Sequence, residues 1–269
     1  MSEKYISNIL IKELLAESTV IEKKDLSRLL SDKDGIDTLS NKNLEYEICG
    51  NRGYLHNLHD VATKLEIKPL KSYYNEVVYF EEIEKLKFSF SKAKKLSLQY
   101  TLELENKIIL HIMEKSYKTM SEEDRQKFDK GLQKVIGEQG SSSNSTLVGT
   151  AGLLVLGNMG GFATYTFLTT TMSALSFGTL GFGAYTMATS LLSVALGPVG
   201  WAALGIWAIF KLGQPNYKKL IPLVLTTALI RQRIIHENKD AFRNEPNNEA
   251  VILGVIVVII LFFLLVLIS

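Results

Sequence analysis

The chain of 269 residues contains a single cysteine, Cys49. One thiol cannot form an internal disulfide and excludes any cluster of cysteine ligands. This cysteine usage fits a reducing compartment. The N-terminus also lacks the basic region and the apolar run of a signal peptide, so we expect the N-terminal part to stay in the cytoplasm.

The sequence has no P-loop, no dinucleotide fingerprint and no nucleophile elbow. Residues 178–183 are glycine-rich like a phosphate loop, but no lysine stands near them. Ser and Thr hydroxyls are frequent in the hydrophobic half, where no His, Asp, Glu or Lys is present to activate one. We therefore expect no enzyme activity and no cofactor.

Two small groups of polar residues resemble metal sites only weakly. His56 and His59 share one face of a predicted helix and follow Cys49, but this spacing matches no strong zinc pattern. The carboxylates between Asp32 and Asp37 lie near Gly35 without the twelve-residue loop of a calcium hand. Structural roles and turn chemistry are the preferred interpretations, so no metal is expected.

Charge is distributed very unevenly along the chain. Residues 1–138 hold 23 Lys and Arg against 24 Asp and Glu, whereas residues 139–210 hold no charged residue. Residues 211–249 hold seven basic and four acidic residues, and residues 250–269 are again uncharged. The N-terminal part has no basic stripe, which gives no electrostatic reason to expect nucleic-acid binding.

Apolar residues at helical spacing predict an all-α head over residues 1–138. A capping box formed by Ser121 and Asp124 predicts the start of one of its helices. The Ser-rich segment 139–146 is a flexible linker by composition. Helices of the head are expected at about residues 6–16, 25–31, 54–65, 96–117 and 121–136.

Residues 147–212 are hydrophobic and rich in Gly, Ser and Thr. Segments 147–168 and 172–196 are each long enough to cross a hydrocarbon core of ~30 Å at ~1.5 Å per residue. Glycine weakens a helix in water by up to ~1 kcal/mol but allows close helix contact in lipid. We expect a membrane-interacting helical hairpin, the alternative being a hydrophobic hairpin buried inside a soluble bundle. The glycines expected to pack this hairpin are Gly149, Gly152, Gly157, Gly160, Gly161, Gly178, Gly181 and Gly183.

Residues 201–210 are too short to span a membrane, and Trp201 and Trp207 are expected at its interface. Residues 213–249 are predicted to form a basic juxtamembrane helix, over about 216–239, followed by a polar hinge. A cluster of basic residues here is expected to face anionic headgroups on the cytoplasmic side, at ~1 kcal/mol per charge. An ordinary solvated helix face is the alternative. The cluster consists of Lys211, Lys218, Lys219, Arg231 and Arg233.

Residues 250–268 include seventeen Leu, Ile, Val or Phe among nineteen positions. Membrane insertion of such a segment is favourable by roughly 5–10 kcal/mol. Residues 250–269 are therefore predicted to be a C-terminal transmembrane anchor.

Several stretches resemble the YaaW-type family of uncharacterised bacterial proteins. They are residues 25–35 with their Asp-Lys-Asp-Gly turn, residues 54–65, residues 114–123, and Gly197-Pro-Val-Gly200 followed by residues 216–222. The resemblance covers about residues 6–235 and implies a helical protein with no established activity. It also implies a distant grouping with the ubiquinol–cytochrome c chaperones, which assist assembly of a membrane complex. The C-terminal anchor departs from the pattern of typical members, which end near the basic helix.

We interpret the chain as a non-enzymatic protein of the bacterial inner membrane with a cytoplasmic head. The leading hypothesis is a membrane-perturbing or pore-type effector in stress or defence, with the lipid bilayer and other copies of the chain as partners. The alternatives are an assembly factor or chaperone with a membrane-protein client, and a tail-anchored scaffold whose partner is encoded nearby. The lack of ionisable groups in the hydrophobic half argues against an ion-coupled transporter.

Overall fold

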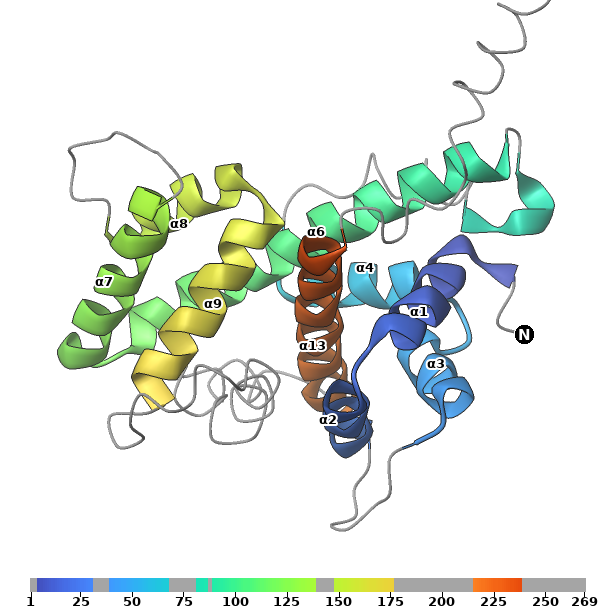
Figure 1. Cartoon of the computed structure of the whole chain (residues 1–269), viewed down its shortest axis with the longest axis horizontal. Helices are drawn as coiled ribbons and strands as arrows, with labels where there is room; N and C mark the ends of the chain where they lie inside the picture. The colour runs from blue at the N-terminus through green and yellow to red at the C-terminus, as the bar shows by residue number, and fades with distance from the viewer. Residues whose placement is uncertain are drawn as a thin grey trace, which may run out of the picture.

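The computed structural model describes residues 4–30, 39–67, 81–86, 89–138, 148–176 and 215–238. These residues are helical, with one isolated antiparallel bridge between Tyr5 and Glu82 and no β-strand among them. The all-α class is therefore confirmed for the described part of the chain (Figure 1). The elements are α1 (Ile6–Glu17), α2 (Val20–Leu30), α3 (Asn41–Cys49), α4 (Tyr54–Lys64), the 3-10 turn η2 (Ile83–Lys85), α6 (Phe90–Thr119), α7 (Glu122–Glu138), α8 (Gly149–Met159), α9 (Gly161–Ser176) and α13 (Pro215–Glu237).

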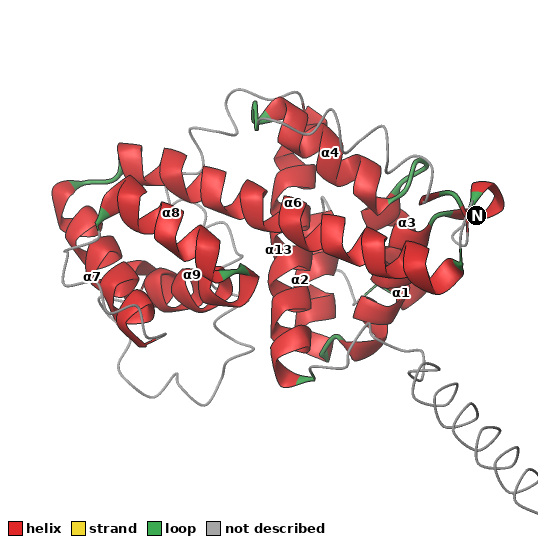
Figure 2. Cartoon of the chain, turned by 90° about the horizontal axis from the view of Figure 1, so that it is seen from above, coloured by secondary structure: helices red, strands yellow, loops and turns green. Residues whose placement is uncertain are grey.

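Helix α6 is the longest described helix, with 30 residues, and the other helices gather around its two ends. One end packs with α7, α8 and α9, and the other packs with α1 and α4 (Figure 2). Helix α13 crosses between the two groups and contacts α2, α4, α6 and α9. All residues of α13 from 221 to 232 are buried. Helix α13 therefore lies at the centre of the described structure and contacts both groups of helices.

The first helices are tied together by hydrogen bonds that side chains accept from buried backbone N–H groups at helix starts. Tyr54 N donates to Asn8 Oδ1 at 3.1 Å, and Leu55 N donates to Ser7 Oγ at 3.2 Å. The buried Glu81 carboxylate in turn accepts from the backbone N–H of Ser7. The side chains thus satisfy donors that the helix starts of α4 and α1 leave open.

The group of α6 to α9 has an aromatic centre. Phe128 packs against Phe167 in an edge arrangement with 4.8 Å between ring centroids, and against Tyr117 at 5.2 Å. Asp129 joins two further helices, because it accepts from Gly149 N at 2.8 Å and from the Tyr117 hydroxyl at 3.0 Å. The bond from Asp124 N to Ser121 Oγ, at 3.2 Å, confirms the predicted capping of α7.

The structure corrects the expectation of one continuous helix over residues 147–168. The chain breaks at Gly160, whose φ of 98° is not helical, and divides into α8 and α9. With 11 and 16 residues, these helices are only about 16 and 24 Å long, below the ~30 Å of a hydrocarbon core. Among the described residues no helix qualifies by length and hydropathy as a membrane span. The expected spans at 172–196 and 250–269 lie partly or wholly outside the described residues.

Candidate functional site: the glycine-rich hairpin on α6 and α13

The candidate site is the interface at which α8 and α9, termed here the hairpin, meet the rest of the protein. At Gly157 of α8, a Cβ atom would lie 2.7 Å from Leu110 Cδ1 of α6. At Gly161 of α9, a Cβ atom would lie 2.5 Å from Gln232 Nε2 of α13. Both distances are shorter than real Cβ contacts, so glycine permits the approach of these helices. The glycines do serve helix packing, but their described partners are helices of the same fold.

The remaining described glycines of the hairpin do not lie at the contacts with Leu110 and Gln232. Gly149 begins α8 with φ of 57° and lies against the Tyr117 ring, which a Cβ would approach to 3.1 Å. Gly160 has open space around it and is required by its backbone conformation alone. Gly152 is buried within α8. Gly178, Gly181 and Gly183 lie outside the described residues.

The hairpin buries one apolar side and exposes part of the other. Leu156, Ala163 and Phe167 are buried in the common core, whereas Leu154 is 73% exposed. Phe162 of α9 stacks on His236 of α13, with 3.8 Å between ring centroids. For residues 148–168 this is the arrangement of a buried hairpin, the alternative that the sequence leaves open.

Arg231 of α13 lies at the centre of the fold and is completely buried. Its Nε atom is 3.2 Å from both carboxylate oxygens of Glu105 in α6, and Tyr54 of α4 donates to Glu105 Oε1 at 2.7 Å. Burial raises the pKa of the Glu105 carboxyl, although Arg231 and Tyr54 oppose that rise. Burial and the Glu105 charge both raise the pKa of Tyr54. The three side chains join α4, α6 and α13 at one point.

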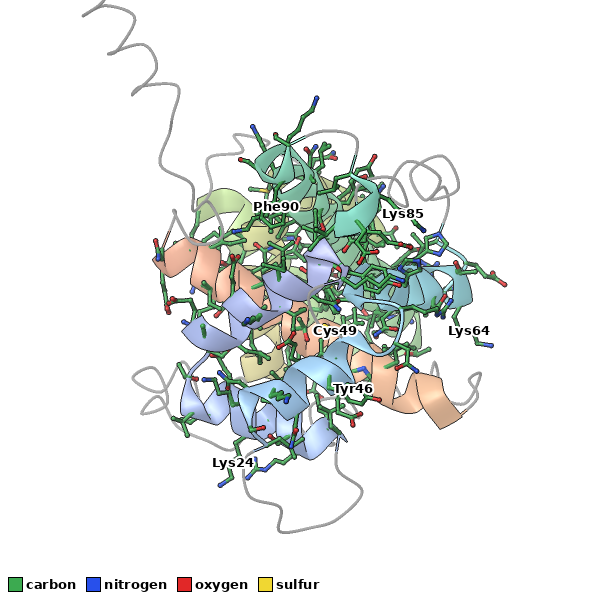
Figure 3. All side chains as sticks on the ribbon, turned by 90° about the vertical axis from the view of Figure 1, so that its right-hand side faces the viewer. Lys24, Tyr46, Cys49, Lys64, Lys85 and Phe90 are labelled. Atoms are coloured by element: carbon green, nitrogen blue, oxygen red, sulfur yellow. The ribbon has the colours of Figure 1, made fainter. Side chains whose placement is uncertain are left out.

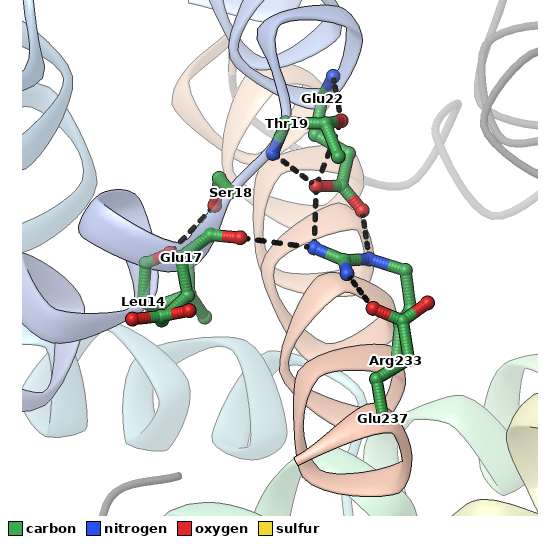
Figure 4. Close-up of polar contacts among 7 residues, drawn as sticks. All are labelled: Leu14, Glu17, Ser18, Thr19, Glu22, Arg233 and Glu237. Atoms are coloured by element: carbon green, nitrogen blue, oxygen red, sulfur yellow. Dashed lines mark hydrogen bonds and ion pairs between the residues drawn. The ribbon is translucent and has the colours of Figure 1, made fainter.

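Arg233, also on α13, binds the start of α2 (Figure 4). Its Nε and Nη2 atoms donate to the two oxygens of buried Glu22 at 2.6 and 2.8 Å, and Nη2 reaches Glu17 O at 3.2 Å. Its Nη1 pairs with Glu237. Glu22 also accepts from Thr19 N at 2.8 Å, while Glu22 N donates to Thr19 Oγ1 at 3.2 Å. This reciprocal capping box fixes α2, and Arg233 ties it to α13.

These placements correct the expected basic cluster. Arg231 and Arg233 hold helices together inside the protein and are not presented to headgroups, because Glu105 and Glu22 supply buried counter-charges. Lys218 and Lys219 belong to the first turns of α13. Lys211, Trp201 and Trp207 lie outside the described residues.

One feature of the sequence could have predicted the ion pair between Arg231 and Glu105. Glu105 stands among the apolar residues Leu104 and Ile108 on the core-facing side of the predicted helix. A carboxylate on an apolar face needs a buried partner. Arg231 follows the apolar run Leu223–Ile230 and is the matching cation.

The weak metal candidates do not come together. Cys49 is buried, the His56 ring packs on Tyr5 with 5.9 Å between centroids, and His59 Nδ1 lies 3.5 Å from Thr63 Oγ1. Within the described ranges, no three His, Cys, Asp or Glu side chains are grouped to hold a metal ion. The carboxylates at 32–37 lie outside the described residues.

Comparison with known proteins finds a distant relative. The chain is 28% identical over 174 residues to a UPF0174 protein of Helicobacter pylori, a match that covers 61% of this chain. The match spans 65% of the length of that relative. The similarity suggests an uncharacterised family. No family model matches the chain, and no solved structure matches it significantly.

Proposed function

We propose that this is a non-enzymatic, tail-anchored protein of the bacterial inner membrane that stores a membrane-active hairpin on its head. When the hairpin leaves α6, α7 and α13, it enters the bilayer together with the uncharged residues that follow it and makes the bilayer permeable. The observation that carries this proposal is the contrast between the hairpin and its support. The hairpin lies within the 72 uncharged residues from 139 to 210, yet it packs on a head in which nearly one residue in three is charged.

The chemistry of the interface supports release of the hairpin as a unit. Its contacts with α6 and α13 are made by glycines and apolar or aromatic side chains, including Gly157, Gly161 and Phe162. No charge is transferred to lipid when such a surface moves from protein into hydrocarbon, so the large cost of an intramembrane charge does not arise. Release would still expose the core surface that Phe167 now covers, which keeps the docked state preferred until a trigger acts.

Helix α13 is the fixed part of this mechanism. Arg231 and Arg233 bind Glu105 and Glu22, and moving either arginine into lipid would separate a buried ion pair. The proposal thus assigns α6, α7 and α13 to the support and α8 and α9 to the moving element. The predicted anchor at 250–269 would keep the hairpin close to the bilayer.

A second candidate function is a membrane-tethered assembly factor or scaffold, in which the hairpin never leaves the head. Burial of Leu156, Ala163 and Phe167 in one core with Phe128 favours this alternative. The YaaW-type resemblance, with its distant grouping among assembly chaperones, points the same way. The two functions differ in whether activity requires the hairpin to move.

A disulfide between the hairpin and α6 distinguishes these functions. Leu110→Cys and Gly157→Cys are combined with Cys49→Ser, because the atoms nearest to a Cβ at residue 157 are those of the Leu110 side chain, at 2.7 to 4.0 Å. A cysteine at each position therefore brings two thiols to the same contact, where they can form a disulfide. Purified protein is added to dye-loaded vesicles of bacterial lipid. The effector function predicts dye release that is lost on oxidation and restored by reductant.

The matched control carries Leu154→Cys with Cys49→Ser, which places one exposed thiol on the hairpin without a partner. Its dye release should be insensitive to oxidation under non-dimerising conditions. Equal release from the oxidised and reduced double-cysteine protein would refute a moving hairpin. Absence of release in every state would favour the scaffold.

A further inference from the structure

A small cavity lies between the start of α1 and one side of α3 with the two residues that follow it. Its volume is about 150 Å³. A cavity of about this size accommodates a benzene-sized molecule. Figure 3 shows α3 with Tyr46 and Cys49 labelled. The lining includes Tyr5, Asn8, Lys42, Glu45, Tyr46 and Cys49.

Glu45 gives this cavity its chemical character. Its side chain is 8% exposed, and its Oε1 atom is buried without a hydrogen-bond partner. Other buried glutamates of the described structure have donors: Glu22 binds Arg233, Glu81 binds Ser7 and Ser97, and Glu105 binds Arg231 and Tyr54. Since a buried carboxylate without a partner is costly, Glu45 stands out as an acceptor that lacks its donor.

The walls of the cavity suit a positively charged donor. Tyr5 and Tyr46 line the same cavity as Glu45. Aromatic rings attract a cation by ~0.5–2 kcal/mol, and a carboxylate adds a charge-assisted hydrogen bond. The volume limits the occupant to the size of a short alkyl chain with one charged end.

Lys42 is the competing counter-ion within the chain. It precedes Glu45 by three residues on α3, so a lysine and a glutamate at this spacing can meet on a helix surface. In the described structure, however, Lys42 is exposed, while the Oε1 atom of Glu45 is buried without a hydrogen-bond partner. A test of the cavity must therefore separate an external cation from the Lys42 ammonium.

We propose that this cavity is a binding site for a small organic cation, an alkylammonium or guanidinium group, with Glu45 as its counter-ion. The ligand is a free small molecule, since a cavity of about 150 Å³ holds a single short group. The site is independent of the hairpin and of the function proposed above.

The test uses the full chain in a non-ionic detergent and measures binding of n-butylammonium by isothermal titration calorimetry. n-Butanol, which has nearly the same shape without the charge, is the neutral probe. We expect butylammonium to bind at least tenfold more tightly than butanol. Glu45→Gln should reduce that affinity at least tenfold, whereas Lys42→Met should leave it unchanged or tighten it.

Thermal unfolding of the wild-type protein supplies a second measurement that needs no variant. A cation that binds the folded state should raise the unfolding midpoint as its concentration increases, whereas butanol should not. Thermal unfolding of Glu45→Gln checks that this variant is folded. Equal affinity for the two probes overturns the proposal, as does an unchanged affinity in Glu45→Gln. Binding seen only after Lys42→Met overturns it too, since Lys42 would then be the occupant.

Discussion

Arg231 and Glu105, 126 positions apart in the sequence, form an ion pair in which both side chains are buried from solvent. Their contact joins α13 to the middle of α6, and the Tyr54 hydroxyl completes the hydrogen bonds of the carboxylate. A buried ion pair gains little over apolar residues of similar size, but losing one member leaves an uncompensated charge. The pair therefore specifies where α13 docks more than it adds to stability.

Removing either partner of this pair should destabilise the fold strongly. Arg231→Met or Glu105→Leu alone should lower the free energy of unfolding by about 3–5 kcal/mol, because each leaves one buried charge. The double variant should recover most of that loss. Urea denaturation followed by circular dichroism measures all three variants. Lys118→Met is the control, since Lys118 and Glu114 are 56% and 40% exposed in their pair, and its loss should cost under about 1 kcal/mol. Additive losses in the double variant would contradict the pairing.

The helices that the sequence predicts best are those with a clear apolar period or a cap. The expected segments 6–16, 54–65 and 121–136 correspond closely to α1 (Ile6–Glu17), α4 (Tyr54–Lys64) and α7 (Glu122–Glu138). The predicted helix at 216–239 corresponds to α13 (Pro215–Glu237). Local pattern was sufficient in these segments because it agrees with the tertiary packing.

Helix α3 and the start of α6 escaped prediction for local reasons. Helix α3 (Asn41–Cys49) has no regular apolar period, and its N-cap is Ser40, whose Oγ accepts from Asn43 N at 3.3 Å. Helix α6 begins at Phe90, earlier than expected, because Ser89 caps it within a stretch whose Phe–Ser alternation resembles a strand. A cap alone, without an apolar period, is a weak signal in sequence.

The candidate site required tertiary information. Composition shows that residues 139–210 lack charge, but it does not indicate what covers them. The contacts of Gly157 with Leu110 and of Gly161 with Gln232 join segments 47 and 71 positions apart, which no local pattern encodes. The burial of Arg231 likewise depends on a glutamate in a distant helix.

Substitution of the two contact glycines by leucine should loosen the hairpin. Gly157→Leu and Gly161→Leu together overfill the contacts with α6 and α13, at a cost of about 1–3 kcal/mol per site. If the hairpin is the moving element, this variant should release dye from vesicles faster than wild type.

Gly137→Ala is the control, because a Cβ there meets nothing within 4 Å. It should stabilise the fold by up to ~1 kcal/mol. Leu110→Ala should partly restore docking of Gly157→Leu, and failure to do so would argue against this contact.

Glu81 should make stability depend on pH. Burial raises the pKa of this carboxyl above its usual value of 4.5, so the folded state holds the proton more tightly than the unfolded state. Its contribution to stability is full below pH 4.5 and is lost as pH rises through the folded pKa. Glu81→Gln keeps acceptor and donor atoms for Ser7 and Ser97 and removes the titration.

The free energy of unfolding of wild type relative to Glu81→Gln should therefore fall as pH rises from 4 to 8. Urea titrations at each pH give this difference. Glu82→Gln is the neighbouring control: the hydrogen bond from Lys85 lowers the pKa of Glu82, so its difference curve should slope the opposite way. A level curve for Glu81→Gln would show that the folded state does not hold this proton.

Ending the chain at residue 249 should change how the protein is held at the membrane. Helix α13 ends at Glu237, so this truncation leaves every described helix intact. Residues 250–269 are predicted to contribute roughly 5–10 kcal/mol of insertion free energy. We expect the full chain to resist extraction by alkaline carbonate and the truncated chain to be extracted. In the truncated chain the hairpin is docked on the protein and does not contact the hydrocarbon of the bilayer, so nothing holds the chain in the membrane.

Two further variants serve as controls. Fusing an unrelated single-span helix after residue 249 should restore resistance, and combining the truncation with the leucine pair at 157 and 161 should restore it in part. A truncated chain that resists carbonate by itself would mean that residues between 147 and 212 already lie in the bilayer before any release.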